Sequence, residues 1–159
     1  ENNFVKAYPT RAVNSIYYDT SEFTNFEESE EGVSERCKLR IRYYNEDNNL
    51  LILENKFKSS DIGWKESKKI TAKGIDSSSI TIITTNSNSK KSKLIIPINI
   101  NNYYTPSLFV TYIRYYFTQE KAKVRLTIDY GLRFARLRNG SKIINRPLLV
   151  VLLISSLIF

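Results

Sequence analysis

Four basic side chains alternate along residues 36–44, and they are the residues in this chain whose types and spacing best suit chemistry. In an extended strand, successive side chains point to opposite faces. One face of this strand would carry Arg36, Lys38, Arg40 and Arg42. The other face would carry Cys37, Leu39, Ile41 and Tyr43. Like charges on one strand face repel unless solvent screens them or an anion binds them. The stretch therefore predicts either a basic strand facing bulk solvent or a ladder of cations facing a polyanion.

The composition favours an anionic partner and excludes several kinds of site. Lys and Arg number 24 against 16 Asp and Glu, a formal net charge of +8 in 159 residues. Such a surplus suits nucleic acid, a phosphate compound or an acidic membrane. The sequence has no His, which excludes a His-ligated metal or a His base within these residues. Its single cysteine, Cys37, excludes an intramolecular disulfide and a multi-cysteine zinc site.

Hydrophobic alternation predicts further strands next to the basic one. Residues 50–58 form the next strand, and the polar connection before them predicts an antiparallel hairpin. Glu54 and Lys56 share one face of that strand. A third strand is predicted over residues 64–71, which adds Lys65 to the charged side.

A second hairpin is predicted later in the chain, over residues 108–117 and 123–130. Arg114 lies on the charged face of its first strand, and Arg125 and Asp129 lie on the charged face of its second. At least four strands thus carry charge on one face and apolar residues on the other. This pattern predicts a single domain with a mainly β fold, minor α content and an antiparallel barrel or tunnel.

The segments before the basic strand predict less regular structure. Residues 1–10 are polar and end at Pro9, which predicts an N-terminal loop. Residues 11–19 have strand character, and the acidic stretch 22–32 predicts a solvated loop or a short helix.

Three later segments are also less regular. Residues 72–107 are rich in Ser, Asn, Thr and Lys and predict a polar, weakly ordered insertion with a short helix. Residues 132–137 predict a short strand. The apolar tail 148–159 is shorter than the span of about 20 residues that crosses a membrane. It predicts a buried strand or helix, or an altered terminus.

If the strands close into one sheet, their charged faces share an interior. A charged interior is costly unless its charges are paired, hydrated or bound to a ligand. Converging basic residues suit a phosphate chain, because each phosphate oxygen needs a donor. Glu54 and Asp129 are the candidate ligands for a hard divalent cation, which prefers carboxylate oxygens. The alternative is that these two carboxylates form ion pairs with Lys56 and Arg125.

Five motifs in this order resemble a known family. They are Ser15-Ile16-Tyr17-Tyr18-Asp19-Thr20, Arg36-x-Lys38-Leu39-Arg40-Ile41-Arg42-x-Tyr44, Leu53-Glu54-x-Lys56, Tyr112-x-Arg114 and Arg125-x-Thr127-x-Asp129. Together they resemble the VTC domain, the polyphosphate polymerase domain of the vacuolar transporter chaperone family. That family belongs with the CYTH-like triphosphate tunnel metalloenzymes. The resemblance covers residues 11–134.

The resemblance implies an antiparallel barrel whose tunnel binds ATP or another triphosphate, or polyphosphate, with Mn²⁺ or Mg²⁺. It implies a phosphate-binding set made up of Lys38, Arg40, Arg42, Lys56, Lys65, Arg114 and Arg125. The implied reaction transfers the terminal phosphoryl group of a nucleoside triphosphate to polyphosphate. No catalytic nucleophile from the protein is implied, because the acceptor is itself a phosphate. The implied location is the cytoplasm or the cytoplasmic face of a membrane.

The chain also departs from the family pattern at both ends. No acidic, lysine-bearing strand precedes Arg11, and the tail 148–159 contains no charged residue where the family has a late Glu and Lys. Because the chain begins at Glu1 and contains no Met, we expect a missing N-terminal segment. Because the first and last family strands have no counterpart here, we expect an open barrel. We therefore expect the chain to bind phosphate compounds but to be a poor catalyst. The alternatives are a non-catalytic polyphosphate-binding module, a triphosphatase of the same superfamily, or a binder of single-stranded nucleic acid.

Overall fold

The computed structural model describes residues 3–45, 47–71, 80–87, 90–97, 100, 103–119, 121, 123–137 and 153–158. In chain order its elements are β1 (Val5–Asp19), α1 (Thr24–Glu30), β2 (Glu35–Tyr44), β3 (Asp47–Ser59), β4 (Ile62–Thr71), β5 (Ile80–Ser87), β6 (Lys90–Pro97), β7 (Thr105–Gln119), β8 (Val124–Arg136) and β9 (Leu153–Ile158). None of the helices in these residues is both long enough and apolar enough to cross a membrane.

Seven strands form one antiparallel sheet in the order β4-β3-β2-β1-β7-β8-β9, and β5 and β6 form a separate hairpin. Across the described residues β4 and β9 are the two edges of the large sheet, which is therefore open rather than closed into a barrel. The prediction of a mainly β, antiparallel and possibly open sheet is confirmed. Both predicted hairpins are present, as β2–β3 and β7–β8.

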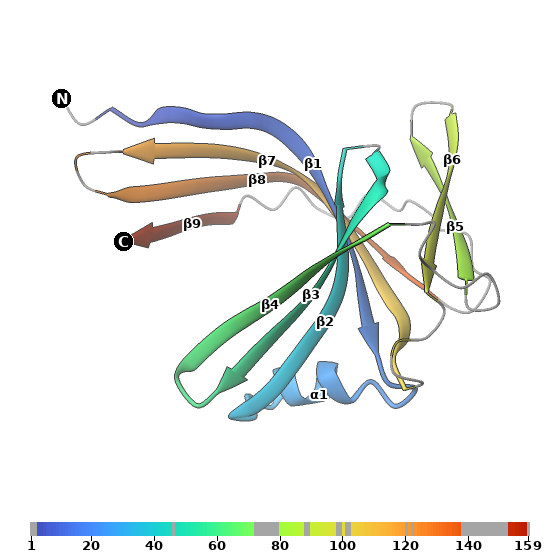
Figure 1. The fold of residues 1–159 in the computed structure, drawn as a ribbon. Helices are drawn as coiled ribbons and strands as arrows, with labels where there is room; N and C mark the ends of the chain where they lie inside the picture. The colour runs from blue at the N-terminus through green and yellow to red at the C-terminus, as the bar shows by residue number, and fades with distance from the viewer. Residues whose placement is uncertain are drawn as a thin grey trace.

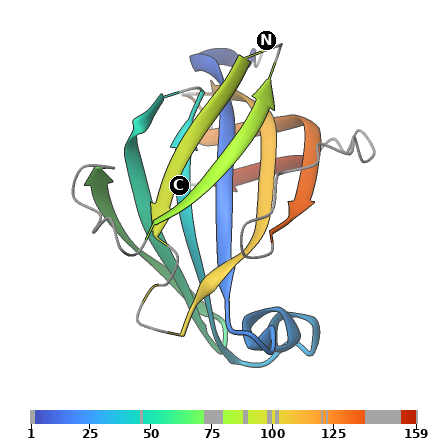
Figure 2. The same ribbon diagram turned by 90° about the vertical axis from the view of Figure 1, so that its right-hand side faces the viewer.

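The large sheet is bent, so that its strands form two diverging arms (Figure 1). The β2–β4 arm consists of residues 13–19, 35–44, 47–59 and 62–71. The β9 arm consists of residues 5–10, 114–119, 124–130 and 153–158. Figure 2 shows the β5–β6 hairpin in front of the sheet, on the side away from the free ends of the arms.

Irregular strand pairing accompanies the bend. β1 and β7 change register between Tyr8 and Arg11, around Pro9. Proline has no N–H to donate to a ladder and is tolerated at such irregularities. β7 and β8 change register after Thr111, at the level of Gly131, whose φ of 67° lies in the left-handed region. Bulges bend strands and increase their twist, so these two irregularities give the sheet its angle.

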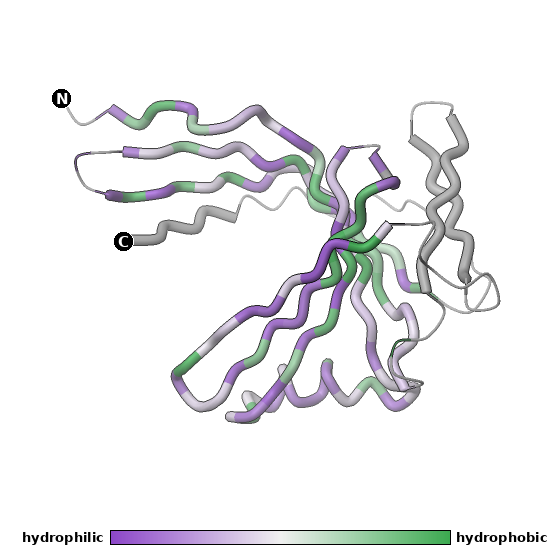
Figure 3. Tube along the Cα trace, viewed as in Figure 1, coloured by the Kyte–Doolittle hydropathy of each residue, from purple (hydrophilic) through white to green (hydrophobic). Residues whose placement is uncertain are grey.

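The apolar face of the sheet forms the core. Its buried cluster comprises Ile16, Tyr18, Leu39, Ile41, Tyr43, Leu51, Phe109, Ala135 and Leu137. On β2 these residues alternate with the basic ones, as the sequence predicts. Figure 3 shows that hydrophobic residues concentrate where the strands converge, whereas hydrophilic residues recur along both arms. Burial of this one face therefore fixes which side of each strand carries its charges.

The helix α1 is tied to the end of β1 by a buried carboxylate. Asp19 accepts hydrogen bonds from the backbone N–H groups of Thr20 and Asn25 through Oδ1, at 2.8 and 2.9 Å. Its Oδ2 accepts one from the N–H of Phe26 at 3.1 Å. The bonds from Asn25 and Phe26 involve N–H groups in the first turn of α1, where such groups have no i−4 partner within the helix. Of the two structures predicted for the acidic stretch, the short helix is the one that forms.

Four segments differ from, or sharpen, the sequence predictions. The predicted N-terminal loop is wrong, because β1 begins at Val5 and continues through Pro9 at an irregularity. Residues 80–97 contain a hairpin instead of a short helix. The predicted short strand 132–137 instead continues β8, since pairing with β7 resumes beyond Gly131. The tail contains a strand, β9, which pairs with β8. The other parts of the insertion and tail, including residues 72–79 and 148–152, lie outside the described residues.

Candidate functional site

The charged face of the sheet is assembled by strand register. Tyr17 on β1 pairs with Arg40 on β2, and Arg40 pairs with Glu54 on β3. Directly paired residues of antiparallel strands point to the same face. The same rule places Ser15 beside Arg42, and Arg11 beside Arg114 on β7. We call the side that carries these residues the charged face.

Three cations surround the buried carboxylate of Glu54, which is 4% exposed. Arg40 Nε donates to Oε2 at 2.7 Å, and Arg42 Nη1 lies 3.6 Å from the same oxygen. Lys65 Nζ donates to Oε1 at 3.0 Å. Arg40 also donates through Nη1 to the hydroxyl oxygen of Tyr17 at 3.1 Å. We call Arg40, Arg42, Glu54 and Lys65 the Glu54 cluster, and it carries two positive charges in excess.

The electrostatics of the cluster favour an ionised Glu54. Burial by itself raises the pKa of this carboxyl group. The hydrogen bond from Lys65 and the charges of Arg40 and Arg42 lower the pKa, and together they outweigh the effect of burial. The net result is a pKa below the ordinary value for glutamate. Glu54 therefore holds the three cations in place without neutralising all of them.

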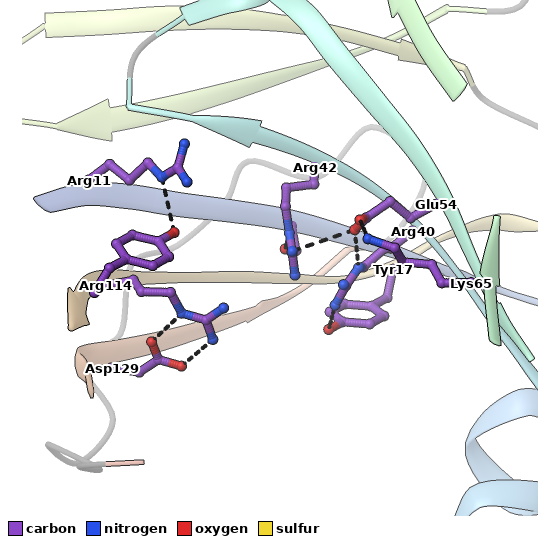
Figure 4. A network of polar contacts seen from close by, with 10 residues as sticks. Arg11, Tyr17, Arg40, Arg42, Glu54, Lys65, Arg114 and Asp129 are labelled. Carbon is purple, nitrogen blue, oxygen red and sulfur yellow. Dashed lines mark hydrogen bonds and ion pairs between the residues drawn. The ribbon is translucent and has the colours of Figure 1, made fainter. Parts of the chain in front are cut away.

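Within the Glu54 cluster, Arg42 lies on the side that faces a second ion pair (Figure 4). Its Nε is 3.4 Å from Ser15 Oγ, and both Ser15 and Val13 are 1% exposed on the floor of the charged face. Burial raises the pKa of Tyr112, whereas the nearby charges of Arg42 and Arg114 act to lower it. Tyr112 also contacts Arg114, whose Cζ lies 5.1 Å from the centroid of its ring.

The second ion pair joins Arg114 on β7 to Asp129 on β8. Arg114 donates through Nε and Nη2 to the two carboxylate oxygens of Asp129, each at 2.6 Å. A bidentate arginine–carboxylate pair of this kind is among the stronger hydrogen-bonded contacts in proteins. The hydrogen bonds to Asp129 raise the pKa of Arg114. Here one cation meets one anion, so the Arg114–Asp129 pair is neutral.

Lysines form a row across the β2–β4 arm. Lys38 pairs with Lys56, and Lys56 pairs with Lys65 on the other side. Like charges directly opposite one another are destabilising in a sheet. Lys38 Nζ donates to Ser29 Oγ on α1 at 2.6 Å, and Lys56 is exposed. The row adds positive charge beside the Glu54 cluster.

Arg125 is the predicted phosphate-binding residue that lies apart from the others. It is exposed on β8, in the β9 arm, four residues before Asp129. At about 3.3 Å per residue this separates the two backbone positions by about 13 Å. The predicted ion pairing of both carboxylates is present, but with other partners than the predicted Lys56 and Arg125. Glu54 binds Arg40, Arg42 and Lys65, and Asp129 binds Arg114.

The family model of the VTC domain matches residues 2–151 of the chain. The chain belongs to the VTC-domain family. A comparison with curated proteins found no match. The match starts earlier and ends later than residues 11–134, over which the sequence motifs were recognised. Membership relates the chain to polyphosphate-related function.

The VTC-domain resemblance also implies a divalent metal held by carboxylates, and the described residues do not fit one. Both oxygens of Glu54 and both oxygens of Asp129 accept bonds from cationic side chains. Within the described part of the chain, three or more Asp, Glu, His or Cys side chains nowhere gather as a metal site would require. Hard cations take several oxygen ligands, so these two carboxylates alone do not make a metal site.

Sequence reasoning missed two aromatic partners and one arginine of this VTC-domain site. Tyr17 binds Arg40, and Tyr116 OH accepts a hydrogen bond from Arg11 Nε at 3.0 Å. The alternation of β1 carried a usable signal, because Arg11, Val13, Ser15 and Tyr17 share one face. That signal was obscured by the expectation that Pro9 closes a loop just before Arg11.

Proposed function

We propose that the charged face binds triphosphate and polyphosphate, and that the Glu54 cluster is the principal phosphate site. The observation that carries the proposal is the excess of two positive charges, held by one buried carboxylate on the floor of an open sheet. Arginine offers a planar fork of donors that matches phosphate oxygens, and lysine adds a point charge. The lysine row extends this positive surface toward the edge of the β2–β4 arm.

We further propose the family reaction, phosphoryl transfer from a nucleoside triphosphate to polyphosphate, at the cytoplasmic side of the cell where ATP is the donor. A terminal oxygen of the acceptor chain attacks the γ-phosphorus, the bond to the β–γ bridging oxygen breaks, and the nucleoside diphosphate leaves with the negative charge. The acceptor supplies the nucleophile, so the protein contributes positioning and charge neutralisation. Arg40 and Arg42 are the residues placed to do both.

A second candidate is a polyphosphate-binding module without turnover. It is favoured by the engagement of both candidate metal ligands, Glu54 and Asp129, by arginine and lysine. Phosphoryl transfer relies on a metal that bridges phosphate oxygens. An assay of polyphosphate synthesis from ATP, with and without Mn²⁺, separates the two candidates. Synthesis that requires Mn²⁺ supports the enzyme, whereas polyphosphate binding without synthesis supports the module.

The binding proposal is tested by titrating tripolyphosphate in a calorimeter. The double variant Arg40→Ala/Arg42→Ala should lose about 3 to 6 kcal/mol of binding free energy, because each hydrogen bond to a charged group contributes about 1.5 to 3 kcal/mol. The control Lys68→Ala/Arg133→Ala removes two positive charges from the opposite face, since Lys68 pairs with Leu53 and Arg133 pairs with Thr111. Equal losses in the two double variants would mean that only net charge matters, and would refute the site.

A further inference from the structure

Arg11 is a cation on the charged face that the phosphate-binding set so far does not include. It lies directly opposite Arg114 in the β1–β7 register. Asp129 neutralises Arg114 through two bonds, but in the described residues Arg11 has no carboxylate within ion-pair distance. The position therefore carries one uncompensated positive charge beside a neutral pair.

Two tyrosine rings fix the orientation of this guanidinium. Its Cζ lies 4.3 Å from the ring centroid of Tyr44 on β2 and 4.8 Å from that of Tyr116 on β7. Contacts of this kind between arginine and aromatic faces are attractive. The hydrogen bond to Tyr116 OH uses Nε alone, and no bond within the described part of the chain uses the two terminal nitrogens. Figure 4 shows the hydrogen bond from Arg11 as a dashed line.

A guanidinium with its stem clamped and its terminal nitrogens available is suited to bind a phosphate. The clamp lowers the entropy that an exposed arginine would lose on binding an anion. The neutral Arg114–Asp129 pair allows Arg11 to sit opposite another arginine without two unscreened charges facing each other. The tyrosine contacts and the available terminal nitrogens suit Arg11 to bind an anion and not to form a structural ion pair.

The separation along β1 determines which anion reaches this site. Arg11 lies four residues before Ser15, which pairs with Arg42, and six residues before Tyr17, which pairs with Arg40. These separations are about 13 Å and about 20 Å along the strand. A triphosphate centred on Arg40, Arg42 and Lys65 is shorter than the distance from Arg40 to Arg11. A longer polyphosphate chain that lies over Val13 and Ser15 would reach from the Glu54 cluster to Arg11.

We infer that Arg11 forms an outer subsite that binds long polyphosphate chains and leaves triphosphate untouched. The inference rests on the proposed function, because it places a second contact on the same phosphate chain. It makes Arg11 a determinant of chain length, with Tyr44 and Tyr116 as its positioning residues.

The test compares two ligands, tripolyphosphate and polyphosphate with tens of phosphates, by competition binding at constant salt. Arg11→Gln should lower the affinity for the long polyphosphate by at least about tenfold, as expected for the loss of hydrogen bonds to a charged group. Its affinity for tripolyphosphate should stay within about twofold of wild type, because no contact is lost. The control Arg133→Gln removes an exposed arginine from the opposite face and should leave the ratio of the two affinities unchanged.

A second variant guards against a folding defect in Arg11→Gln. Tyr116→Phe keeps the ring that contacts Arg11 but removes the hydroxyl group that accepts its Nε bond. It should give a smaller loss, again selective for the long chain. Equal loss for both ligands, or no loss for either, overturns the inference in both variants.

The outcomes also separate this inference from the proposed function. If wild-type protein binds neither ligand, both fail. If Arg40→Ala/Arg42→Ala loses both ligands while Arg11→Gln and Tyr116→Phe behave like wild type, only the outer subsite is refuted. If Arg11→Gln and Tyr116→Phe lower the affinity for the long polyphosphate alone, the outer subsite and the proposed function are both supported.

Discussion

The two ion groups of the charged face differ in how their charges balance. In the Glu54 cluster three cations from β2 and β4 share one carboxylate that is 4% exposed. In the Arg114–Asp129 pair a single guanidinium meets a single carboxylate through two 2.6 Å bonds. The first group attracts anions, and the second has satisfied its charges within the protein.

The difference suggests a division of labour along one face. A buried carboxylate surrounded by several cations makes an anion-binding site. It fixes the geometry of the cations but neutralises only one of their charges. A neutral bidentate pair instead holds β7 and β8 together at the bend. Three of the predicted phosphate-binding residues belong to the first group, and Arg114 belongs to the second.

The largest expected effect comes from removing each carboxylate in turn. Glu54→Gln leaves three cations clustered at a site that is mostly shielded from water, and should lower the free energy of unfolding by about 3 to 5 kcal/mol. Asp129→Asn leaves only Arg114, which is partly exposed, and should cost about 1 to 2 kcal/mol. Urea denaturation followed by circular dichroism measures both values. A larger loss in Asp129→Asn than in Glu54→Gln would reverse the comparison.

The bend between the two groups provides the next test. Gly131→Ala places a side chain at a φ of 67°, where a left-handed conformation costs about 1 to 2 kcal/mol. The cost is conformational, since an added Cβ would meet no atom within 4 Å. Gly63→Ala is the control, because its added Cβ would make an ordinary contact at 3.7 Å and its φ is not positive. Thermal unfolding of the two variants should show a loss at position 131 alone.

A smaller effect is expected from single lysines on the two faces of β4. Lys65→Ala removes a contact of the Glu54 cluster, and should weaken tripolyphosphate binding about fivefold, or about 1 kcal/mol, because this side chain is half exposed. Lys68→Ala removes the same charge from the opposite face of the same strand and should leave affinity close to wild type. Titration calorimetry distinguishes the two, and matching losses would assign binding to net charge alone.

The smallest expected effect is a change in acid stability. The pKa of Glu54 is lowered in the folded state, so the unfolded state binds the proton more readily. Its stabilising contribution is fully present above the ordinary glutamate pKa of about 4.3 and is lost as pH falls through the lower folded value. Urea midpoints measured across this range should fall toward acid in wild type and fall less in Glu54→Gln. Parallel curves would show that Glu54 is not stabilised as a carboxylate.

Strand alternation was sufficient to predict most of the charged face. The basic strand, its partner strand and the later hairpin follow from period-two patterns, which hold along the stretches between register shifts. Pro9 and Gly131 could not be interpreted in the same way, because a bulge depends on what the neighbouring strand does. A proline that ends a strand and one that bulges within it look alike in sequence.

The ion-pair partners were harder to predict than the strands. Lys56 stands two residues from Glu54, and Arg125 four residues from Asp129, so each seemed the natural partner along its own strand. All four partners in the structure come from neighbouring strands, where directly opposite side chains lie closer than residues two apart. Only strand register identifies them, and register depends on the bulges.

A crystal structure of the protein with tripolyphosphate bound would show where the phosphate chain lies. Phosphate oxygens should contact Arg40, Arg42 and Lys65 on the charged face, with Glu54 still holding the two arginines and the Arg114–Asp129 pair intact. Phosphate bound on the opposite face, near Lys68 and Arg133, would contradict the site. So would a structure in which Arg114 leaves Asp129 to bind the ligand while the Glu54 cluster makes no contact with it.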